Sequence, residues 1–437
     1  LYEDDGLLVI LMVNIKDNQL AVSSEAGTLQ KVLIHRPDNG IEKVTPSRAT
    51  YLLYEDIVFL PKMQEEHDIF TECLSLFLGR KNVIDIQTLL KEVLEDDEIK
   101  RELIHTVCGI EECEERLEDF LKEADASILA ETLISGVFAH KKKIPVFFPL
   151  PNLIFTRDLG TVINGHLLIA QAALKARSRE SVFCYYIFHH HPLFKKFSAQ
   201  GKIIELASNS KELIYLNNGK LGVESIEGGD VMLISKDHLL LGCSERTSMA
   251  AIEKIKNQLL EKQVVKKISV INLPKLRYCM HLDTIFTMIS HQECVGYSPL
   301  VMKENAMEIK QYSSDQPKPE IFPSLENLIL SEFPEMDFIP CGEGIFPYDE
   351  REQWTDGCNL FAIRASVAFT YDRNIKTNEA LKAKGFTIIS AAELSKEIKS
   401  GKIRAESITK TIITIPSSEL SRARGGPHCM TMPLLRI

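Results

Sequence analysis

A short local pattern that recurs along the chain constrains the fold more than any other feature. In its clearest copy, residues 230–244 read DVMLISKDHLLLGCS, two apolar runs separated by Ser-Lys-Asp, which predicts a β-hairpin. A helix is expected next, in SMAAIEKIKNQLLEK, where apolar residues recur at helical spacing at Met249, Ile252, Ile255 and Leu259. Residues 264–273 (VVKKISVINL) then indicate a strand. The unit is therefore hairpin, helix and strand.

Further copies of this unit follow at uneven spacing. Residues 358–373 (CNLFAIRASVAFTYDR) predict a hairpin, and residues 377–385 and 386–390 predict the helix and strand after it. Two more hairpins are expected in LGTVINGHLLIAQ (159–171) and DTIFTMISHQECVGYS (283–298). Such copies suggest structural repetition around a centre. A simple mixed α/β sheet also fits the pattern, and both architectures stay open at this point.

A highly charged stretch interrupts the pattern. Residues 86–138 predict helices, with apolar residues at helical spacing at Leu117, Phe120, Leu121, Ala124 and Ile128. We expect a solvated helical insert packed on the main body. No shift in composition marks a second independent domain.

Composition limits the classes of function. The 437 residues are 45% hydrophobic and 26% charged, which is typical of a soluble globular protein with a large core. The net charge is −10, and residues 91–125 alone hold 14 acidic against 5 basic side chains. A basic face for nucleic acid is therefore not expected.

The ten cysteines form no C-x-x-C pair and show no regular spacing. Several lie within apolar runs, among them Cys184, Cys243 and Cys294. This pattern is typical of reduced, mostly buried thiols in a cytosolic protein. We expect a cytoplasmic protein without a disulfide framework.

The N-terminal run LLVILMV (residues 7–13) is too short to span a bilayer. Its acidic flank, Tyr-Glu-Asp-Asp, differs from the positive flank of a secretory signal. No membrane association is expected. Because the first residue is Leu1, we expect either a fragment or a start further along, such as Met12.

Small polar clusters interrupt the strand and loop sequence. They are PNLIFTRD (151–158), EGGD (227–230), SERT (244–247), MHLDT (280–284), REQWTDGCN (351–359) and RGGPHCMTMP (424–433). If MHLDTIF is a strand, His281 and Asp283 face the same side, which suits proton transfer. Two polar residues at a half-buried strand edge are the simpler explanation.

The other clusters also have plain explanations. Glu227 and Asp230 flank two glycines that would let the backbone approach a ligand, but a tight turn before the strand explains them equally well. Asp158 follows Arg157, where a local ion pair would suffice. No single cluster identifies a site.

Taken together, the clusters favour one chemistry. The carboxylates of Asp158, Glu227 and Asp283 are suited to a guanidinium, whose planar N–H groups donate bidentate hydrogen bonds to carboxylates. Cys429 offers a nucleophile, and a cationic substrate would stabilise its thiolate. Arginines at 177, 246 and 424 would then bind a carboxylate at the far end of the substrate.

These motifs resemble, in order and with fitting spacing, those of the arginine deiminase family. PNLIFTRD, EGGD, SERT, MHLDT, REQWTDG, YDRN-x-x-TNE and RGGP-x-CM-x-MP are similar to its successive motifs, and residues 27–46 and 52–70 are similar to its N-terminal region. The similarity runs from about residue 23 to residue 436.

The resemblance implies a five-bladed, pseudo-symmetric α/β propeller of the guanidino-group-modifying superfamily. One catalytic domain would span residues 20–437, with a helical insert at 86–138. The implied reaction converts free L-arginine and water to L-citrulline and ammonia, without metal or organic cofactor. We further expect a homo-oligomer that binds neither nucleic acid nor membrane.

The resemblance also implies roles for single residues. Cys429 corresponds to the nucleophile and His281 to the acid/base group. Asp158, Asp283 and Glu227 correspond to the acids that bind the guanidinium. The implied substrate-binding residues are Asn152 and Phe155 near the α-amino end, Asp230 as a supporting acid, and Arg177, Arg246 and Arg424 on the α-carboxylate.

Two positions depart from the family pattern. Ala423 stands where the family usually has Gly, which would weaken binding if that backbone needs a positive φ. Leu159-Gly160 replaces the usual Pro-Phe after FTRD and would alter the pocket wall.

Other functions stay open. His281, Asp283, Glu227 and Cys429 would suit a zinc hydrolase, although no clustered Cys/His motif is present. A Cys/His protease, a catalytically silent deiminase-like binding protein, and a deiminase for agmatine or methylated arginine are further alternatives. The run His189-His190-His191 is more consistent with a packed or solvated loop than with a metal site.

Overall fold

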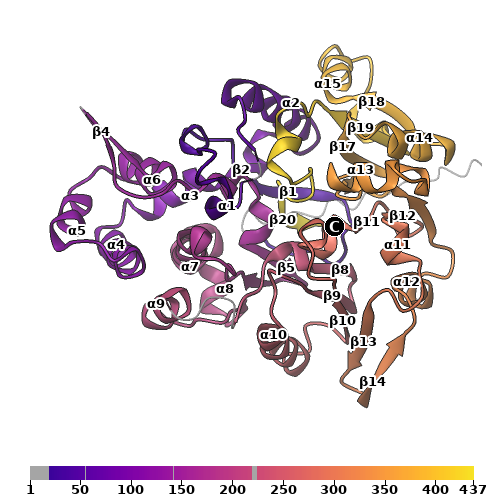
Figure 1. Cartoon of the computed structure of the whole chain (residues 1–437), viewed down its shortest axis with the longest axis horizontal. Helices are drawn as coiled ribbons and strands as arrows, with labels where there is room; N and C mark the ends of the chain where they lie inside the picture. Colours follow the sequence, from indigo (N-terminus) through magenta and orange to yellow (C-terminus); the bar gives the residue numbers. More distant parts are fainter. Residues whose placement is uncertain (1–18, 55, 141, 219–223) are drawn as a thin grey trace, which may run out of the picture.

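Five small β-sheets and one separate hairpin form the framework of the described residues (Figure 1). The structure is a computed structural model, and it describes residues 19–54, 56–140, 142–218 and 224–437. The predictions for residues 7–13 and Met12 lie outside these ranges.

Each sheet is built from three to five strands. The strand orders are β2(Val83–Asp85)-β1(Leu29–Ile34)-β20(Met432–Arg436); β5(Gly160–Ile163)-β6(His166–Ile169)-β7(Ile203–Ile204); β14(Gln316–Phe322)-β13(Glu308–Ser313)-β10(Lys267–Asn272)-β9(His238–Cys243)-β8(Val231–Ser235); β11(Phe286–Met288)-β12(Glu293–Gly296)-β15(Asp337–Pro340); and β16(Phe361–Arg364)-β17(Val367–Tyr371)-β19(Thr411–Ile415)-β18(Thr387–Ser390).

All five sheets share one topology. In four of them an antiparallel hairpin is followed by a parallel third strand, as in β8, β9 and β10. In the fifth, β20 pairs antiparallel with β1, and β2 adds in parallel. The predicted repetition is confirmed, and the single mixed sheet is wrong for the described residues. The last sheet joins the two ends of the described chain.

Helices connect the second and third strands of each unit. The connecting helices are α2(Leu60–Leu78), α7(Ser178–His190), α8(Pro192–Ala199), α10(Met249–Glu261), α12(Leu325–Glu332) and α14(Ile375–Ala383), and α15(Ala391–Lys399) follows β18. In α10, Ser248 accepts a hydrogen bond from the Ala251 amide, which begins the helix. Ile252, Ile255 and Leu259 are buried as predicted, but Met249 is 41% exposed because it lies in the first turn, beyond the buried face.

The charged stretch forms four helices. They are α3(Ile86–Val93), α4(Asp97–Glu111), α5(Glu115–Lys122) and α6(Ala126–Ser135). Asp96 and Asp125 accept amide hydrogen bonds at the starts of α4 and α6. The predicted helical character is confirmed. The apolar residues from Leu117 to Ile128 do not belong to one helix, however, because α5 ends at Lys122 and Asp125 caps the start of α6. The hairpin of β3(Val137–His140) and β4(Lys142–Pro145) follows.

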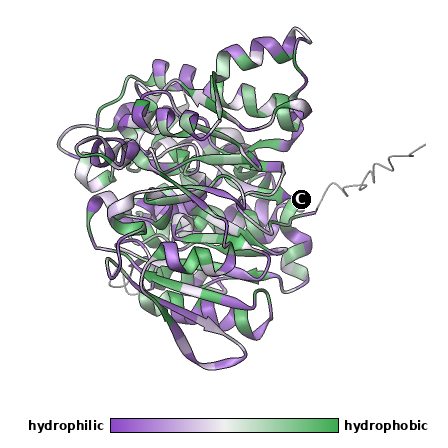
Figure 2. Ribbon diagram, turned by 90° about the vertical axis from the view of Figure 1, so that its right-hand side faces the viewer, coloured by the Kyte–Doolittle hydropathy of each residue, from purple (hydrophilic) through white to green (hydrophobic). Residues whose placement is uncertain are grey.

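The core consists of four apolar clusters. One joins the four charged helices to α7 and α8, and three lie among the remaining sheets and their helices. In the view of Figure 1, β1, β5, β11 and β20 lie near the middle, most helices lie further out, and β4 and the β13–β14 hairpin extend to the edges. Figure 2 shows hydrophilic residues along much of the long β13–β14 hairpin at the lower edge, most of whose side chains are at least partly exposed. Among the described residues, no helix combines the length and the apolar character needed to cross a membrane.

Three further expectations can be compared with the structure. All ten cysteines are free thiols, as predicted. The His189–His191 run is the end of helix α7 and not a loop, because the chain stays helical as far as His190. His189 contacts Glu205, whereas His191 contacts Glu92, so the histidines do not converge.

Candidate active site

Five of the six polar clusters lie at the same place in a sheet, at or directly before its first strand. The turns η4(Thr156–Leu159), η6(Gly228–Asp230) and η8(Leu282–Thr284) precede β5, β8 and β11. Turns at 355–358 and 427–430 precede β16 and β20. The sixth cluster, SERT, follows β9 instead. The sequence shows part of this regularity, because four of the clusters are followed by an apolar hairpin. It explains why clusters far apart in the chain meet.

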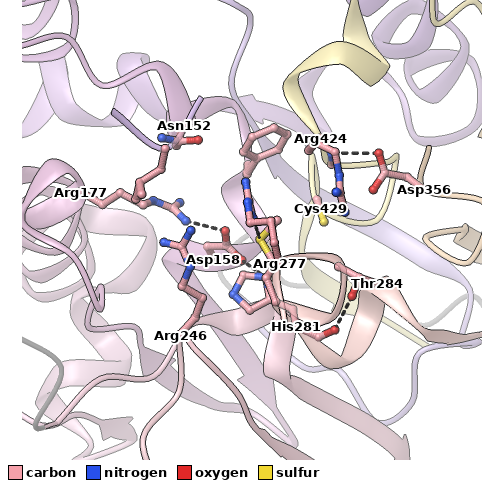
Figure 3. A pocket seen from close by; sticks show the side chains of 14 residues that line it. Asn152, Asp158, Arg177, Arg246, Arg277, His281, Thr284, Asp356, Arg424 and Cys429 are labelled. Carbon is pink, nitrogen blue, oxygen red and sulfur yellow. Dashed lines mark hydrogen bonds and ion pairs between the residues drawn. The ribbon is translucent and has the colours of Figure 1, made fainter. Parts of the chain in front are cut away.

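One pocket brings most of the predicted residues together (Figure 3). Eight of them line it: Asn152, Phe155, Asp158, Arg177, Arg246, His281, Arg424 and Cys429. Three others are buried but are not part of the lining: Glu227, Asp230 and Asp283. The lining residues that we did not predict are Leu53, Arg277, Met280, Thr284, Asp356 and Gly425.

Cys429 is a buried thiol beside a carboxylate. Its Sγ lies 3.5 Å from Oδ2 of Asp283, and its amide donates a 3.0 Å hydrogen bond to Oδ1 of Asn359. Burial, together with the negative charges of Asp283 and Asp158, raises the pKa of Cys429 well above its ordinary value. The thiol is therefore protonated at neutral pH.

Asp283 is held by a chain of buried polar groups that we did not predict. Its Oδ2 lies 2.8 Å from Nδ1 of His428, and Nε2 of His428 lies 3.0 Å from Oε2 of Glu25. Burial opposes ionisation of Asp283, but His428, His281 and Arg157 keep its pKa below the ordinary value. Asp283 is therefore a carboxylate directed toward the sulfur.

His281 lies between two carboxylates. Its Nε2 is 3.0 Å from Oε2 of Glu227, and its Nδ1 is 3.7 Å from Oδ1 of Asp158. Burial alone would lower the pKa of His281. The charge of Asp158, the hydrogen bond with Glu227 and the charge of Asp230 outweigh burial and raise this pKa to about 9. The imidazole is therefore charged at neutral pH and can donate a proton.

The predicted strand over MHLDTIF is wrong. His281 precedes the turn η8, and β11 begins only at Phe286. The Thr284 amide bonds the His281 carbonyl at 3.2 Å, and this closes a turn in place of an extended segment. This turn brings His281 and Asp283 to the same site. The predicted reason, alternation of side chains along a strand, is wrong.

Arg177 lies among the acids in this structure. Its Nη1 is 2.6 Å from Oδ2 of Asp158 (Figure 3). The same Nη1 is 3.3 Å from Oε2 of Glu227, and Nη2 is 2.7 Å from Oε2 of Glu180. Arg157 contacts Glu25 at 3.5 Å, so the local pair expected between Arg157 and Asp158 is replaced by more distant partners. A planar guanidinium thus occupies the acidic end of the pocket.

The pocket lining contains further arginines. Arg246 lines both this pocket and a wider depression that also includes Arg277 and Lys275. The Ser244 hydroxyl accepts a 2.9 Å hydrogen bond from the Arg246 amide, which fixes the backbone of the SERT turn. Arg424 lines the pocket from the C-terminal loop. Such guanidinium groups are suited to binding an anionic group.

Comparisons with known proteins agree with this geometry. The family model of arginine deiminase matches residues 135–436. The chain is 32% identical over 444 residues to the arginine deiminase of Listeria monocytogenes serotype 4b, covering 96% of this chain and 98% of that protein. It is 32% identical over 449 residues to that of Staphylococcus aureus strain JH9, covering 96% and 99%.

The chain belongs to the arginine deiminase family. The predicted family is confirmed. A solved structure of SxtG, an amidinotransferase from Microseira wollei, covers 95% of this chain and 97% of its own with a TM-score of 0.53 and 13% identity. This likeness concerns the fold alone, which is a mixed α/β fold of the amidinotransferase type.

The departures from the arginine deiminase pattern leave the pocket intact. Ala423 ends the turn η11(Leu420–Ala423) and packs in the core, and the positive φ of +59° belongs to Arg424. The positive φ that would have made Ala423 unfavourable is therefore not required at this position. Leu159 is also buried in the core and is not part of the pocket lining.

The two glycines of EGGD are explained by close packing within the protein better than by contact with a ligand. A Cβ at Gly229 would lie 2.6 Å from Nδ1 of His281, and one at Gly228 would collide with the Arg157 carbonyl. Asp230 accepts hydrogen bonds from Ser244 at 2.6 Å and from the Leu282 amide at 2.9 Å. Burial raises its pKa to about 7. This motif therefore packs η6 against η8.

The residues proposed for zinc do not assemble as a set. Among the described residues, the potential metal ligands within 4.8 Å of one another are Asp158, Glu227 and His281. Asp283 and Cys429 are not part of that group. The guanidinium of Arg177 already bonds both carboxylates of the group, so these acids match a cationic organic head group well.

Proposed function

We propose that this chain hydrolyses the guanidinium group of free L-arginine to L-citrulline and ammonia. The observation that carries the proposal is the convergence of the Cys429 thiol, the His281 imidazole and buried acids at one pocket, in a chain of the arginine deiminase family. The acids bind the cationic head, and the sulfur attacks its carbon.

Substrate binding requires Arg177 to move. Asp158 and Glu227 bond its guanidinium in the substrate-free structure, and the substrate presents the same chemical group. The substrate head group replaces Arg177 between these acids. Arg177 then joins Arg246 and Arg424 on the α-carboxylate.

The first half of the reaction forms a carbon–sulfur bond. The bound cation lowers the pKa of Cys429, and Asp283 accepts the thiol proton across 3.5 Å. The thiolate attacks the guanidinium carbon to give a neutral tetrahedral adduct. His281 donates its proton to one nitrogen, the carbon–nitrogen bond breaks, and ammonia leaves a cationic thiouronium on Cys429.

The second half consumes water. Neutral His281 takes a proton from the water as its oxygen bonds the thiouronium carbon. The carbon–sulfur bond then breaks with its electron pair on sulfur, and the thiolate takes the hydroxyl proton to leave citrulline. Ammonia takes the proton from Asp283 and departs as ammonium, so the overall change is arginine plus water to citrulline plus ammonium.

The remaining predicted residues have supporting roles in this proposal. Asn152 and Phe155 line the pocket. Nδ2 of the Asn152 side chain also donates a 2.6 Å hydrogen bond to the Leu52 carbonyl. We assign both to the α-amino end. Asp230 acts behind the pocket, where it holds the turn that carries His281.

The arginines favour free arginine over agmatine. Agmatine has no carboxylate, so it lacks the group that would bind Arg246 and Arg424, whereas free arginine has it. An arginine within a peptide has its carboxylate tied up in an amide. A silent binding protein is the alternative that an activity measurement decides.

For the architecture we propose five blades in one catalytic domain. The shared topology of the five sheets and the β1–β20 pairing of the chain ends support a closed, pseudo-symmetric α/β propeller over residues 20–437. The helices of 86–138 then form an insert within it. A cytoplasmic location and a homo-oligomeric state stay predictions.

The test is citrulline formation by the purified protein. We expect the wild type to release citrulline and ammonia from L-arginine, and Cys429→Ser to release neither. Cys113→Ser is the matched control, because Cys113 lies in the helical segment away from the pocket and is expected to keep full activity. Equal rates for wild type and Cys429→Ser would remove Cys429 as the nucleophile.

Two further arms separate the alternatives. Activity after dialysis against a chelator is expected to be unchanged, and loss with recovery on adding zinc would favour a metal hydrolase. Faster turnover of agmatine or dimethylarginine than of arginine would reassign the substrate. Binding of arginine without turnover by the wild type would favour the silent binding protein.

A further inference from the structure

The guanidinium of Arg424 is stacked on an indole ring. Its Cζ lies 3.6 Å from the ring centroid of Trp354, the last residue of α13(Tyr348–Trp354). Arg424 is only 4% exposed and lines the pocket, whereas Trp354 is 44% exposed and lies outside the lining. Trp354 thus supports Arg424 from the side that faces solvent. Trp354 is the single tryptophan of the chain.

The backbone beside Arg424 is fixed by other groups. The Gly425 amide donates a 3.0 Å hydrogen bond to Oδ2 of Asp356, and the Tyr371 hydroxyl donates a 2.6 Å bond to the Gly425 carbonyl. These bonds hold the loop in spite of the positive φ of Arg424. These bonds act on the backbone and do not restrict the torsions of the long Arg424 side chain.

An aromatic face can restrict that side chain without neutralising it. The ring attracts a cation through its quadrupole and covers the flat face of the guanidinium. It leaves the N–H edge directed to the sides, where a carboxylate binds in the guanidinium plane. A carboxylate in the position of Trp354 would instead compete with a bound anion. The arrangement therefore suits an arginine that binds an anionic ligand.

We propose that Trp354 is a positioning residue for Arg424, and through it a determinant of affinity for the substrate α-carboxylate. This inference rests on the proposed function. Trp354 does not contact the reacting carbon, so its contribution is to binding and not to the chemical step. Removing it weakens ground-state and transition-state binding equally, which raises KM and leaves kcat unchanged.

Steady-state kinetics with L-arginine test this split. Trp354→Ala is expected to raise KM roughly two- to fivefold, the range for an exposed cation–π contact, with kcat within about twofold of the wild type. Trp354→Phe keeps an aromatic face and is expected to restore most of the affinity. Tyr348→Ala is the matched control, because Tyr348 lies on the same helix and is also 44% exposed.

Three results would overturn the proposal. These are an unchanged KM in Trp354→Ala, a fall in kcat at constant KM, and a Trp354→Phe variant no better than Trp354→Ala. A rise in KM of the same size in Tyr348→Ala would also overturn it, because the effect would then belong to the helix as a whole.

Fluorescence reports the contact without any turnover. Because Trp354 is the single tryptophan, its emission and its quenching by acrylamide report one site, and Trp354→Phe gives the blank. Arg424→Ala is expected to increase quenching, since the covered face of the indole becomes accessible. Equal quenching in the wild type and Arg424→Ala would show that the stack does not form.

The outcomes separate this inference from the proposed function. If the wild type forms no citrulline, the proposed function fails, and the quenching experiment still decides whether Arg424 covers the indole. If the wild type forms citrulline and Trp354→Ala has the wild-type KM, only the inference fails.

Discussion

Cys429 and His281 both carry protons in the substrate-free protein, for opposite electrostatic reasons. Acids beside a buried thiol disfavour its anion, whereas acids beside a buried imidazole favour its cation. The substrate brings a positive charge to the same acids. In the proposed reaction this charge favours the thiolate of Cys429, so the thiol becomes more reactive once the substrate is bound.

The charged state of His281 predicts an alkaline limit to activity. The pKa of His281 is raised to about 9, so we expect kcat/KM to fall as pH rises through that value and the imidazole loses its proton. Glu227→Gln removes a negative neighbour of the imidazolium. We expect this variant to lower the His281 pKa and move the alkaline limb to lower pH.

The measurement is the pH profile of kcat/KM for the wild type and Glu227→Gln. Samples held at each pH and returned to pH 7 control for irreversible inactivation. An alkaline limb at the same pH in both proteins would show that His281 is not the titrating group.

At the scale of elements, each unit contributes one short turn, and the turns pack edge to edge. Gly229 of η6 lies against the His281 ring, which begins η8. The close approach leaves no room for a side chain. The position of His281, the proposed acid/base group, is therefore set by the neighbouring unit as well as by its own.

Gly229→Ala tests this packing. Its Cβ would lie 2.6 Å from Nδ1 of His281, so the ring must shift. A displacement on the order of 1 Å costs about 100-fold in rate, and we expect kcat to fall between about 10- and 100-fold. Turnover of L-arginine under saturation measures this effect.

Gly109→Ala provides the control for Gly229→Ala. Gly109 lies within α4, and the nearest atom to its added Cβ is the flexible Ile214 side chain, so activity is expected to stay at the wild-type level. A Gly229→Ala protein with wild-type kcat would mean that the turn adjusts without moving the imidazole.

At the scale of the whole molecule, buried ion pairs connect parts of the chain that are distant in sequence. Glu25 lies near the start of the described residues, and it contacts Arg157 of η4 at 3.5 Å and His428 of the C-terminal loop at 3.0 Å. Burial would raise the pKa of Glu25, but Arg157, His428 and Arg436 lower it to about 2. The carboxylate thus joins both chain ends to the site.

Glu25→Gln is expected to destabilise the fold. Removing one partner of a buried ion pair leaves charges uncompensated and costs roughly 3 kcal/mol or more of the free energy of unfolding at pH 7. A depressed pKa contributes stability above about 4.5 that is lost as pH falls toward 2. The difference in the free energy of unfolding between wild type and Glu25→Gln should therefore become smaller as pH falls through this range.

Urea unfolding at pH 7, 4 and 3 measures this difference. Glu42→Gln is the control, because the Glu42 side chain is 51% exposed and its pair with Lys43 is long, at 4.0 Å. A difference between Glu25→Gln and wild type that is constant over this pH range would contradict the assigned ionisation.

Helices and hairpins could be predicted where interactions between residues close in sequence determine them. The hairpins, α10 and α14 formed as predicted, because apolar alternation, turn residues and capping act within a few residues. The apolar residues Ile285 and Phe286 favour a strand over MHLDTIF, but that prediction is wrong for His281 to Thr284. The His281–Thr284 turn depends on packing against η6, and no pattern within seven residues records that packing.

Periodicity and ordered motifs are properties of the chain, so the repeated unit, the family and the chemical types gathered at the site could be predicted from the residues alone. Which of these groups are in contact follows from the packing of the units in three dimensions. Arg177 lies among the acids, Trp354 stacks on Arg424, and His428 bridges Asp283 and Glu25, residues 145 and 403 positions away from it. Contacts of that span depend on how separate units pack, and packing energy is set by three-dimensional proximity, which no local pattern encodes.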